Sequence, residues 1–142
     1  MIFQLTYRSK AVETINSKDL DNILQTARAV NSSLNITGCL VFFNNLFFQL
    51  LEGDQNSVTS LFSAIKTDHR HTNVELLVQE PTEDRLFPNW GMAYYPVNDK
   101  EVGKPEFEQF KRNLILLSDF SEAKTITEIR FWNEVKKKVL GF

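Results

Sequence analysis

The chain has 142 residues, of which 42% are apolar and 24% charged, proportions that suit one globular domain and exclude a disordered chain. Its formal charge of −2 argues against a basic face for nucleic acid, and no apolar run approaches the ~20 residues of a membrane span. The single cysteine excludes an intramolecular disulfide, and the N-terminus lacks a signal-peptide pattern, so we expect a cytoplasmic protein.

The first half of the chain predicts a strand, a helix and a hairpin. Residues 2–7 alternate, which places Phe3, Leu5 and Tyr7 on one face of a strand. Apolar residues at helical spacing from 20 to 30 predict a helix that Asn16 or Ser17 caps and that Asn31 ends. Residues 36–43 and 46–52 indicate two strands joined by Asn44-Asn45, a pair that tolerates the positive φ of a two-residue turn.

The second half adds a helix and two strands. Val58, Leu61, Phe62 and Ile65 have helical spacing, and residues 73–80 indicate another strand. The resulting order, βαββαβ, predicts an α+β ferredoxin-like sandwich in which the third strand lies beside the first and both helices cover one sheet face. A fifth strand is expected at 90–95, which gives βαββαββ.

Two more helical patterns, at about 105–118 and 122–140, predict a C-terminal appendage, and we expect a domain at 1–97 followed by this appendage at 98–142. The appendage is too small for a core of its own, so its apolar stripes must cover the second sheet face or another subunit. We therefore expect at least a dimer. The stripes contain Phe107, Phe110, Leu114, Leu117, Phe131, Val135 and Val139.

The segment LFFQLLEG places Gln49 at the centre of an apolar strand, where an amide without partners is costly. The predicted topology puts Tyr7 on the neighbouring strand, so a Tyr–Gln hydrogen bond within the core is one explanation. Such a bond uses only part of the hydrogen-bonding capacity of the Gln49 amide, and Asn31 adds another amide at the adjacent helix. These groups would also suit a planar, heteroatom-rich ligand between the helices and the sheet.

The segment DHRH at 68–71 is interpreted as a surface cluster at a helix end or as an anion contact. A metal site is disfavoured because it needs three or four converging ligands and Arg70 would repel a cation. No phosphate-binding loop, nucleophile elbow or Cys/His pairing occurs in the sequence, so nothing indicates an enzyme.

Five blocks of the sequence together resemble the BLUF domains, sensors of blue light using FAD. The resemblance covers residues 2 to about 97, and the blocks are YRS at 7–9, ITG at 36–38, FFQLLEG at 47–53, DHRHTNVE at 68–75 and FPNWGM at 87–92. It implies a flavin between the two helices, FAD with FMN as the alternative, held non-covalently. It also implies that Tyr7 donates to Gln49, which contacts the flavin ring.

The resemblance implies further roles, position by position. Asn31 would hold the ring, and Asp68 and Arg70 would lie near the ribityl and phosphate end. Trp90 and Met92 match a fifth-strand pair near the glutamine, and with Tyr7 and Gln49 they complete the expected photoactive set. The remaining expected cofactor contacts are Ile23, Ser32, Phe47, Ile65 and His71, where Ser32 replaces an Asn common in the family.

The implied function is a photoreceptor, not an enzyme, in which electron and proton transfer from tyrosine rearranges the glutamine and signals to a partner protein. We expect no catalytic output domain after residue 142, and the sequence does not identify the partner. Two other classes stay open. A flavin oxidoreductase would consume NAD(P)H, and a light-insensitive ferredoxin-like regulatory domain would purify colourless.

Overall fold

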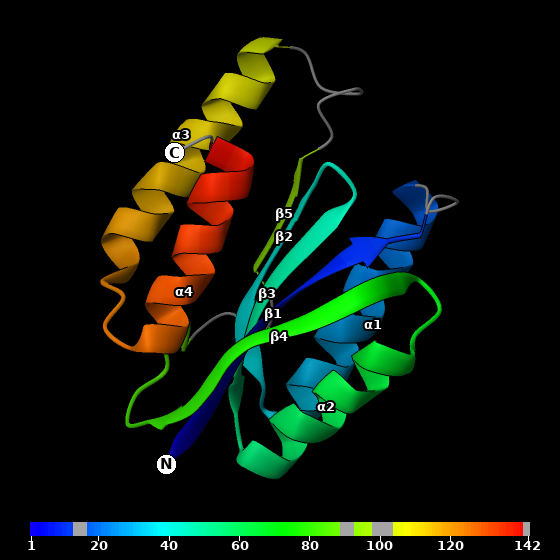
Figure 1. Ribbon diagram of the computed structural model, residues 1–142, viewed down its shortest axis with the longest axis vertical. Helices are drawn as coiled ribbons and strands as arrows, with labels where there is room; N and C mark the ends of the chain where they lie inside the picture. The colour runs from blue at the N-terminus through cyan, green and yellow to red at the C-terminus, as the bar shows by residue number, and fades with distance from the viewer. Residues whose placement is uncertain (13–16, 89–92, 98–103, 141–142) are drawn as a thin grey trace.

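The computed structural model describes residues 1–12, 17–88, 93–97 and 104–140 (Figure 1). In chain order the elements are β1 (Ile2–Ala11), α1 (Ser17–Leu34), β2 (Thr37–Phe43), β3 (Leu46–Gly53), α2 (Gln55–Thr67), β4 (His71–Thr82), β5 (Ala93–Val97), α3 (Lys104–Ser121), α4 (Ile126–Val135) and the π-helical turn η1 (Lys136–Leu140). This order confirms the predicted ferredoxin-like βαββαββ arrangement followed by two helices. Among the residues described, no helix is long and apolar enough to span a membrane.

The sheet has the strand order β4-β1-β3-β2-β5. β1 pairs antiparallel with both β3 and β4, β2 pairs antiparallel with β3, and β5 runs parallel to β2 at the edge. The third strand therefore lies beside the first, as predicted. In this register Tyr7 is directly opposite Gln49, and Gln4 is directly opposite Glu52.

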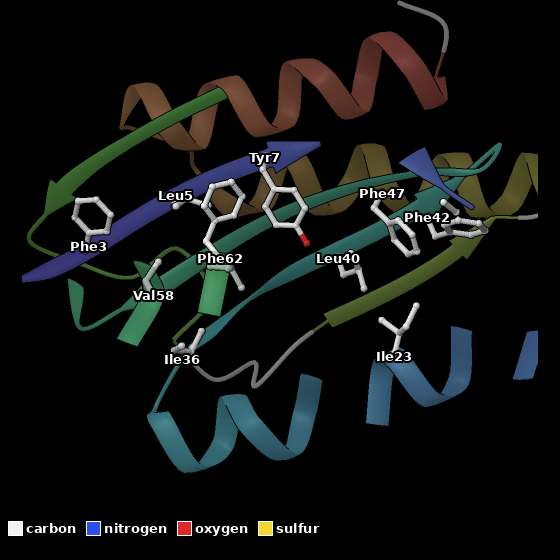
Figure 2. Close-up of a cluster of buried hydrophobic side chains, with 12 residues drawn as sticks. Phe3, Leu5, Tyr7, Ile23, Ile36, Leu40, Phe42, Phe47, Val58 and Phe62 are labelled. Atoms are coloured by element: carbon white, nitrogen blue, oxygen red, sulfur yellow. The ribbon is translucent and has the colours of Figure 1, made fainter. Parts of the chain in front are cut away.

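The two sheet faces carry different helices (Figure 1). α1 and α2 lie on one face and α3 and α4 on the other. Side chains alternate along β1 and β3, so consecutive residues of each strand serve opposite faces. The first core lies between the sheet and the pair α1 and α2 (Figure 2), and it contains Phe3, Leu5, Tyr7, Ala11, Ile23, Ile36, Leu40, Phe42, Phe47, Leu51, Val58 and Phe62.

The second core lies between the sheet and the C-terminal helices. Side chains of α4 and η1 pack there against side chains of β2 and β3. The C-terminal residues are Phe131, Trp132, Val135 and Val139, and the strand residues are Cys39, Val41, Phe48 and Leu50. Leu114 is buried in the same cluster and Leu117 packs against it. These stripe residues therefore cover the second sheet face, while the side chains of Phe107 and Phe110 are outside the part described.

Asparagines with positive φ form the hairpin turn between β2 and β3 and the end of α1. Asn44 and Asn45 have φ of 51° and 64°, which confirms the two-residue hairpin turn. The predicted helix end at Asn31 is wrong, because α1 continues to Leu34 and Asn35 takes the left-handed φ of 55°. Ile36 N–H then donates to the Asn31 carbonyl at 2.8 Å, the bond that ends a helix in a Schellman motif.

Several other boundaries also differ from the sequence expectation: β1 runs to Ala11 and not to residue 7, and β4 covers His71–Thr82 and not 73–80. β5 reaches Val97, beyond the predicted end at residue 95, and residues 89–92 are outside the described ranges. Asn16, one of the two expected caps of α1, is also outside them.

Candidate functional site

A cavity of about 230 Å³ lies between α1, α2 and the sheet. Its walls are largely apolar, and Ile23 of α1 lies across from Leu40 of β2 (Figure 2). Polar side chains from α1, from both central strands and from the segment that follows α2 reach the same space. The lining residues are Tyr7, Ile23, Thr26, Ala27, Val30, Asn31, Leu40, Gln49, Leu61, Ala64, Ile65, Asp68, Arg70 and His71.

Tyr7 and Gln49 form a buried pair at this cavity. The Tyr7 hydroxyl donates a hydrogen bond to Gln49 Oε1, and the two residues are only 1% and 4% exposed. Burial raises the pKa of the Tyr7 phenol, so the hydroxyl keeps its proton and remains a donor. Oε1 accepts from Tyr7, and the hydrogen bonds that this amide can donate come from its Nε2.

The pairing of β1, which carries Tyr7, with the edge strand β4 is locally irregular. The register of β1 against β4 shifts between Thr6 and Tyr7, where Leu77 is the extra residue of β4. Thr6 points to the opposite sheet face, and its Oγ1 donates to the backbone carbonyl of Gln49 at 2.9 Å. The backbone of Gln49 is therefore bonded to a side chain on the opposite sheet face, while Gln49 itself lines the cavity.

The other expected ring contacts are divided between the cavity and its surroundings. Asn31 is fully buried in the last turn of α1 and lines the cavity, as do Ile23 and Ile65. Ser32 is exposed and is not among the lining residues. Phe47 is also outside the lining, but its ring lies 4.6 Å from that of His71, which lines it.

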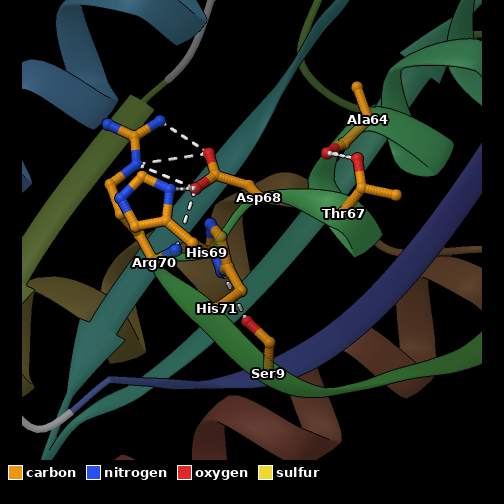
Figure 3. Close-up of polar contacts among 7 residues, drawn as sticks. All are labelled: Ser9, Ala64, Thr67, Asp68, His69, Arg70 and His71. Carbon is orange, nitrogen blue, oxygen red and sulfur yellow. Dashed lines mark hydrogen bonds and ion pairs between the residues drawn. The ribbon is translucent and has the colours of Figure 1, made fainter.

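The segment after α2 places a charged pair at the cavity (Figure 3). Asp68 ends α2 as its C-cap, and its carboxylate accepts from Arg70 Nη2 at 2.6 Å and from Nε at 3.0 Å. These bonds lower the pKa of Asp68 to about 2, so both charges persist at neutral pH. The pair keeps a guanidinium at the cavity, where it can bind a phosphate.

The interpretation of DHRH as a surface cluster holds for His69 but is wrong for His71. The His69 side chain is 94% exposed, whereas His71 begins β4 opposite Ala11 and is buried. His71 Nδ1 lies 2.9 Å from Ser9 Oγ (Figure 3), and burial lowers the pKa of the ring, which favours a neutral imidazole. The part of the chain that is described holds no group of three or more metal-ligating side chains.

Several lining residues were not expected from the sequence: Thr26, Ala27, Val30, Leu40, Leu61 and Ala64. A signal for most of them exists, because Thr26, Ala27 and Val30 follow Ile23 at offsets of 3, 4 and 7, and Ala64 and Ile65 follow Leu61 at offsets of 3 and 4. Small residues at such positions leave space between two helices. Trp90 and Met92 are outside the described residues, so their predicted role stays a prediction.

The residues present fit a flavin. Ile23, Leu40 and Ile65 provide apolar walls for a flat ring, and Asn31 and Gln49 provide amides for its heteroatom edge. Arg70 supplies the cation that a phosphate-bearing tail requires.

Comparison with known proteins agrees with this fit. The family described as "BLUF: Sensors of blue-light using FAD" matches residues 2–93. Subunit beta of the photoactivated adenylate cyclase of Euglena longa is 39% identical over 84 residues, which are 59% of this chain and 10% of that protein. The alpha subunit from Euglena gracilis is 38% identical over 61% of this chain and 8% of its own length. The chain thus spans about a tenth of these relatives.

The chain is also similar to proteins of known structure. The photo-activated state of BlsA is 31% identical, with a TM-score of 0.69 and 94% of each chain covered. BlrB, described as a BLUF protein in its dark state, is 30% identical with a TM-score of 0.66 over 76% of this chain and 82% of that one. A BlrP1 structure from Klebsiella pneumoniae, described as containing FMN and cyclic diGMP, is 34% identical with a TM-score of 0.64 over 79% and 30%.

Proposed function

Because the chain belongs to the BLUF family of blue-light sensors that use flavin, we propose that it binds FAD non-covalently in the cavity between α1 and α2. We propose further that residues 1–97 form the light-sensing unit and that residues 98–142 carry its output. In this proposal the chain has no catalytic activity of its own and signals to a separate effector protein.

The observation that carries the proposal is the Tyr7–Gln49 hydrogen bond at the cavity wall. A bound flavin, once excited by blue light, supplies a strong oxidant. Tyr7 is neutral and buried, so it can give up an electron only together with its hydroxyl proton, and Gln49 is the group that accepts that proton. Both return to Tyr7 at the end of the cycle.

Gln49 suits a switch because the two ends of its amide are similar in size but opposite in hydrogen-bonding character. Rearrangement of the amide exchanges a donor for an acceptor at the ring edge without a change in volume. The surrounding core is closely packed, so the side chain has two discrete arrangements and no continuous range between them. The changed hydrogen bond to the flavin would shift its absorption to the red.

The choice of FAD rests on the family description and on Arg70, held at the cavity by Asp68. A relative described with FMN makes that flavin the alternative. Acid should release the flavin from the purified protein, and chromatography beside FAD and FMN standards identifies it. Flavin that stays with the precipitated protein would contradict non-covalent binding.

The central test is an absorption spectrum recorded before and after blue light. The purified protein should be yellow and should show a reversible red shift. Gln49→Leu keeps the side-chain volume but removes the amide, so this variant should bind flavin without the shift. Gln79 is exposed on β4 and gives the matched control, because Gln79→Leu makes the same chemical change away from the cavity.

Three results would contradict the proposal. These are a colourless protein that does not bind added FAD, a full red shift in Gln49→Leu, and flavin-dependent consumption of NAD(P)H. The first would favour a light-insensitive regulatory domain, the second would make Gln49 structural, and the third would favour an oxidoreductase.

A further inference from the structure

A second buried glutamine lies on the opposite face of the sheet from Gln49. Gln4 is 0% exposed, and its Nε2 donates to Glu52 Oε1 at 3.3 Å and to Glu128 Oε2 at 2.5 Å. Its Oε1 accepts from Thr125 Oγ1 at 2.8 Å. One amide therefore joins β1, β3 and the beginning of α4.

Glu52 extends this cluster into the connection between β4 and β5. The carboxylate is fully buried and accepts from the backbone N–H groups of Leu86 at 2.8 Å and Phe87 at 2.7 Å. Burial raises the pKa of Glu52, although these hydrogen bonds oppose the shift. The orientation of Gln4 is fixed, because turning its oxygen toward two acidic side chains would replace attraction by repulsion.

Glu128 extends the cluster into α4. Its Oε1 accepts from the N–H groups of Lys124 and Thr125, and Thr125 in turn caps the helix through a capping box. Two further contacts hold α4 to the sheet. Thr127 donates to Glu80 of β4 at 2.8 Å through its N–H, and Arg8 of β1 bonds Glu134 at 3.0 Å.

The same two strands carry both glutamine pairs. Gln4 and Glu52 are direct partners in the β1–β3 ladder, and so are Tyr7 and Gln49. The two pairs are separated by three residues along each strand and lie on opposite faces. Between them, Thr6 bonds the Gln49 carbonyl from the face that α4 covers.

We propose that Gln4, Glu52, Glu128 and Thr125 form a polar latch that fixes the start of α4 on the sheet, and that rearrangement of Gln49 in light loosens it. The release of the latch rests on the proposed function, because its trigger is the light-driven rearrangement of Gln49. Apolar contacts of α4 tolerate small displacements, whereas one amide shared by three partners does not, because each bond depends on distance and angle. A small shift of β1 against β3 therefore breaks the hydrogen bonds of the latch before it disrupts the apolar contacts of α4.

Hydrogen exchange measured by mass spectrometry, in darkness and under blue light, tests the latch. In the wild type, light should accelerate exchange in residues 126–135. Gln4→Leu removes the shared donor but leaves the flavin cavity intact, so its α4 should exchange at least about tenfold faster in darkness, with little further gain in light. The red shift should stay normal, and Gln79→Leu should match the wild type.

A second variant protects the test against misfolding of Gln4→Leu. Glu128→Gln keeps an oxygen for the capping N–H groups but places an NH₂ group against Gln4 Nε2, so it should also accelerate α4 exchange. Wild-type rates in α4 for both variants in darkness would overturn the latch, and unchanged exchange of wild-type α4 in light would overturn its release. A wild type without a red shift would instead refute the light-sensing proposal, and the dark comparison would still decide whether the latch exists.

Discussion

Of the two glycines that lie in the described ranges, Gly38 of β2 is the one where an added methyl group should do more damage. It faces Leu51 of β3, and a Cβ built there would lie 1.9 Å from the Leu50 carbonyl oxygen. The obstacle is backbone of a central strand, so no side chain can turn away to make room. Gly38→Ala must therefore move β2 away from β3.

The size of the displacement follows from the geometry. Ordinary contact begins at 3.4 Å, so the strands must separate locally by about 1.5 Å against a spacing of about 4.8 Å. Such a shift breaks or stretches the neighbouring ladder bonds, and with overpacking of this kind we expect a loss of about 3 kcal/mol in the free energy of unfolding. Leu40 opposite Gln49 would move with β2, so flavin affinity should fall too.

Urea unfolding followed by circular dichroism measures the first effect, and titration with FAD measures the second. Gly53→Ala is the matched control, since its Cβ would meet Asn35 O and Ile36 Cγ1 at 3.3 Å, a contact that small movements relieve. A Gly38→Ala variant within about 0.5 kcal/mol of the wild type would refute the reasoning.

Three other predictions concern the site and the assembly. Tyr7→Phe should still bind flavin but lose the normal red shift, and unfolding should become easier by about 1 kcal/mol because Gln49 Oε1 loses its donor; a normal photocycle would contradict Tyr7 as the electron source. Burial lowers the pKa of His71, so below about pH 6.5 the unfolded chain binds a proton at this residue more readily than the folded protein does. The free energy of unfolding should therefore fall as the pH drops. Chemical unfolding at about pH 7.5 and about pH 5.5 should show a smaller decline in His71→Gln, and an equal decline would assign the effect to another group. The dimer stays a prediction, because the described stripe residues cover the sheet and not another subunit; light scattering at micromolar concentration should give a mass of at least twice the 16.5 kDa of one chain, and a monomer mass would contradict it.

Local patterns in the sequence predicted the order of elements because each pattern reports its own surroundings. Alternation in β1 and the Asn44-Asn45 turn depend on neighbouring residues alone. The pairing of Tyr7 with Gln49 followed from topology, since only a third strand inserted beside the first brings them together. The cofactor and its contacts came from family resemblance and not from residue spacing.

The features that were missed depend on contacts between distant segments. Asn31 and Asn35 both suit a helix end, and the choice falls on Asn35 because Ile36 then enters the first core. His71 belongs to the start of β4, where pairing with β1 buries it. The bond between Gln4 and Glu128 joins residues 124 positions apart, so it depends on where α4 docks.

The burial of Cys39 has a practical consequence. It is the single cysteine of the chain, it is 0% exposed within the second core, and burial raises the pKa of its thiol. Maleimides and similar reagents react with exposed thiolates, so Cys39 of the folded protein should not react with them. A cysteine introduced at Asn133, exposed on α4, would then be labelled selectively, and a fluorescent or spin probe there could follow the helix through each flash of light.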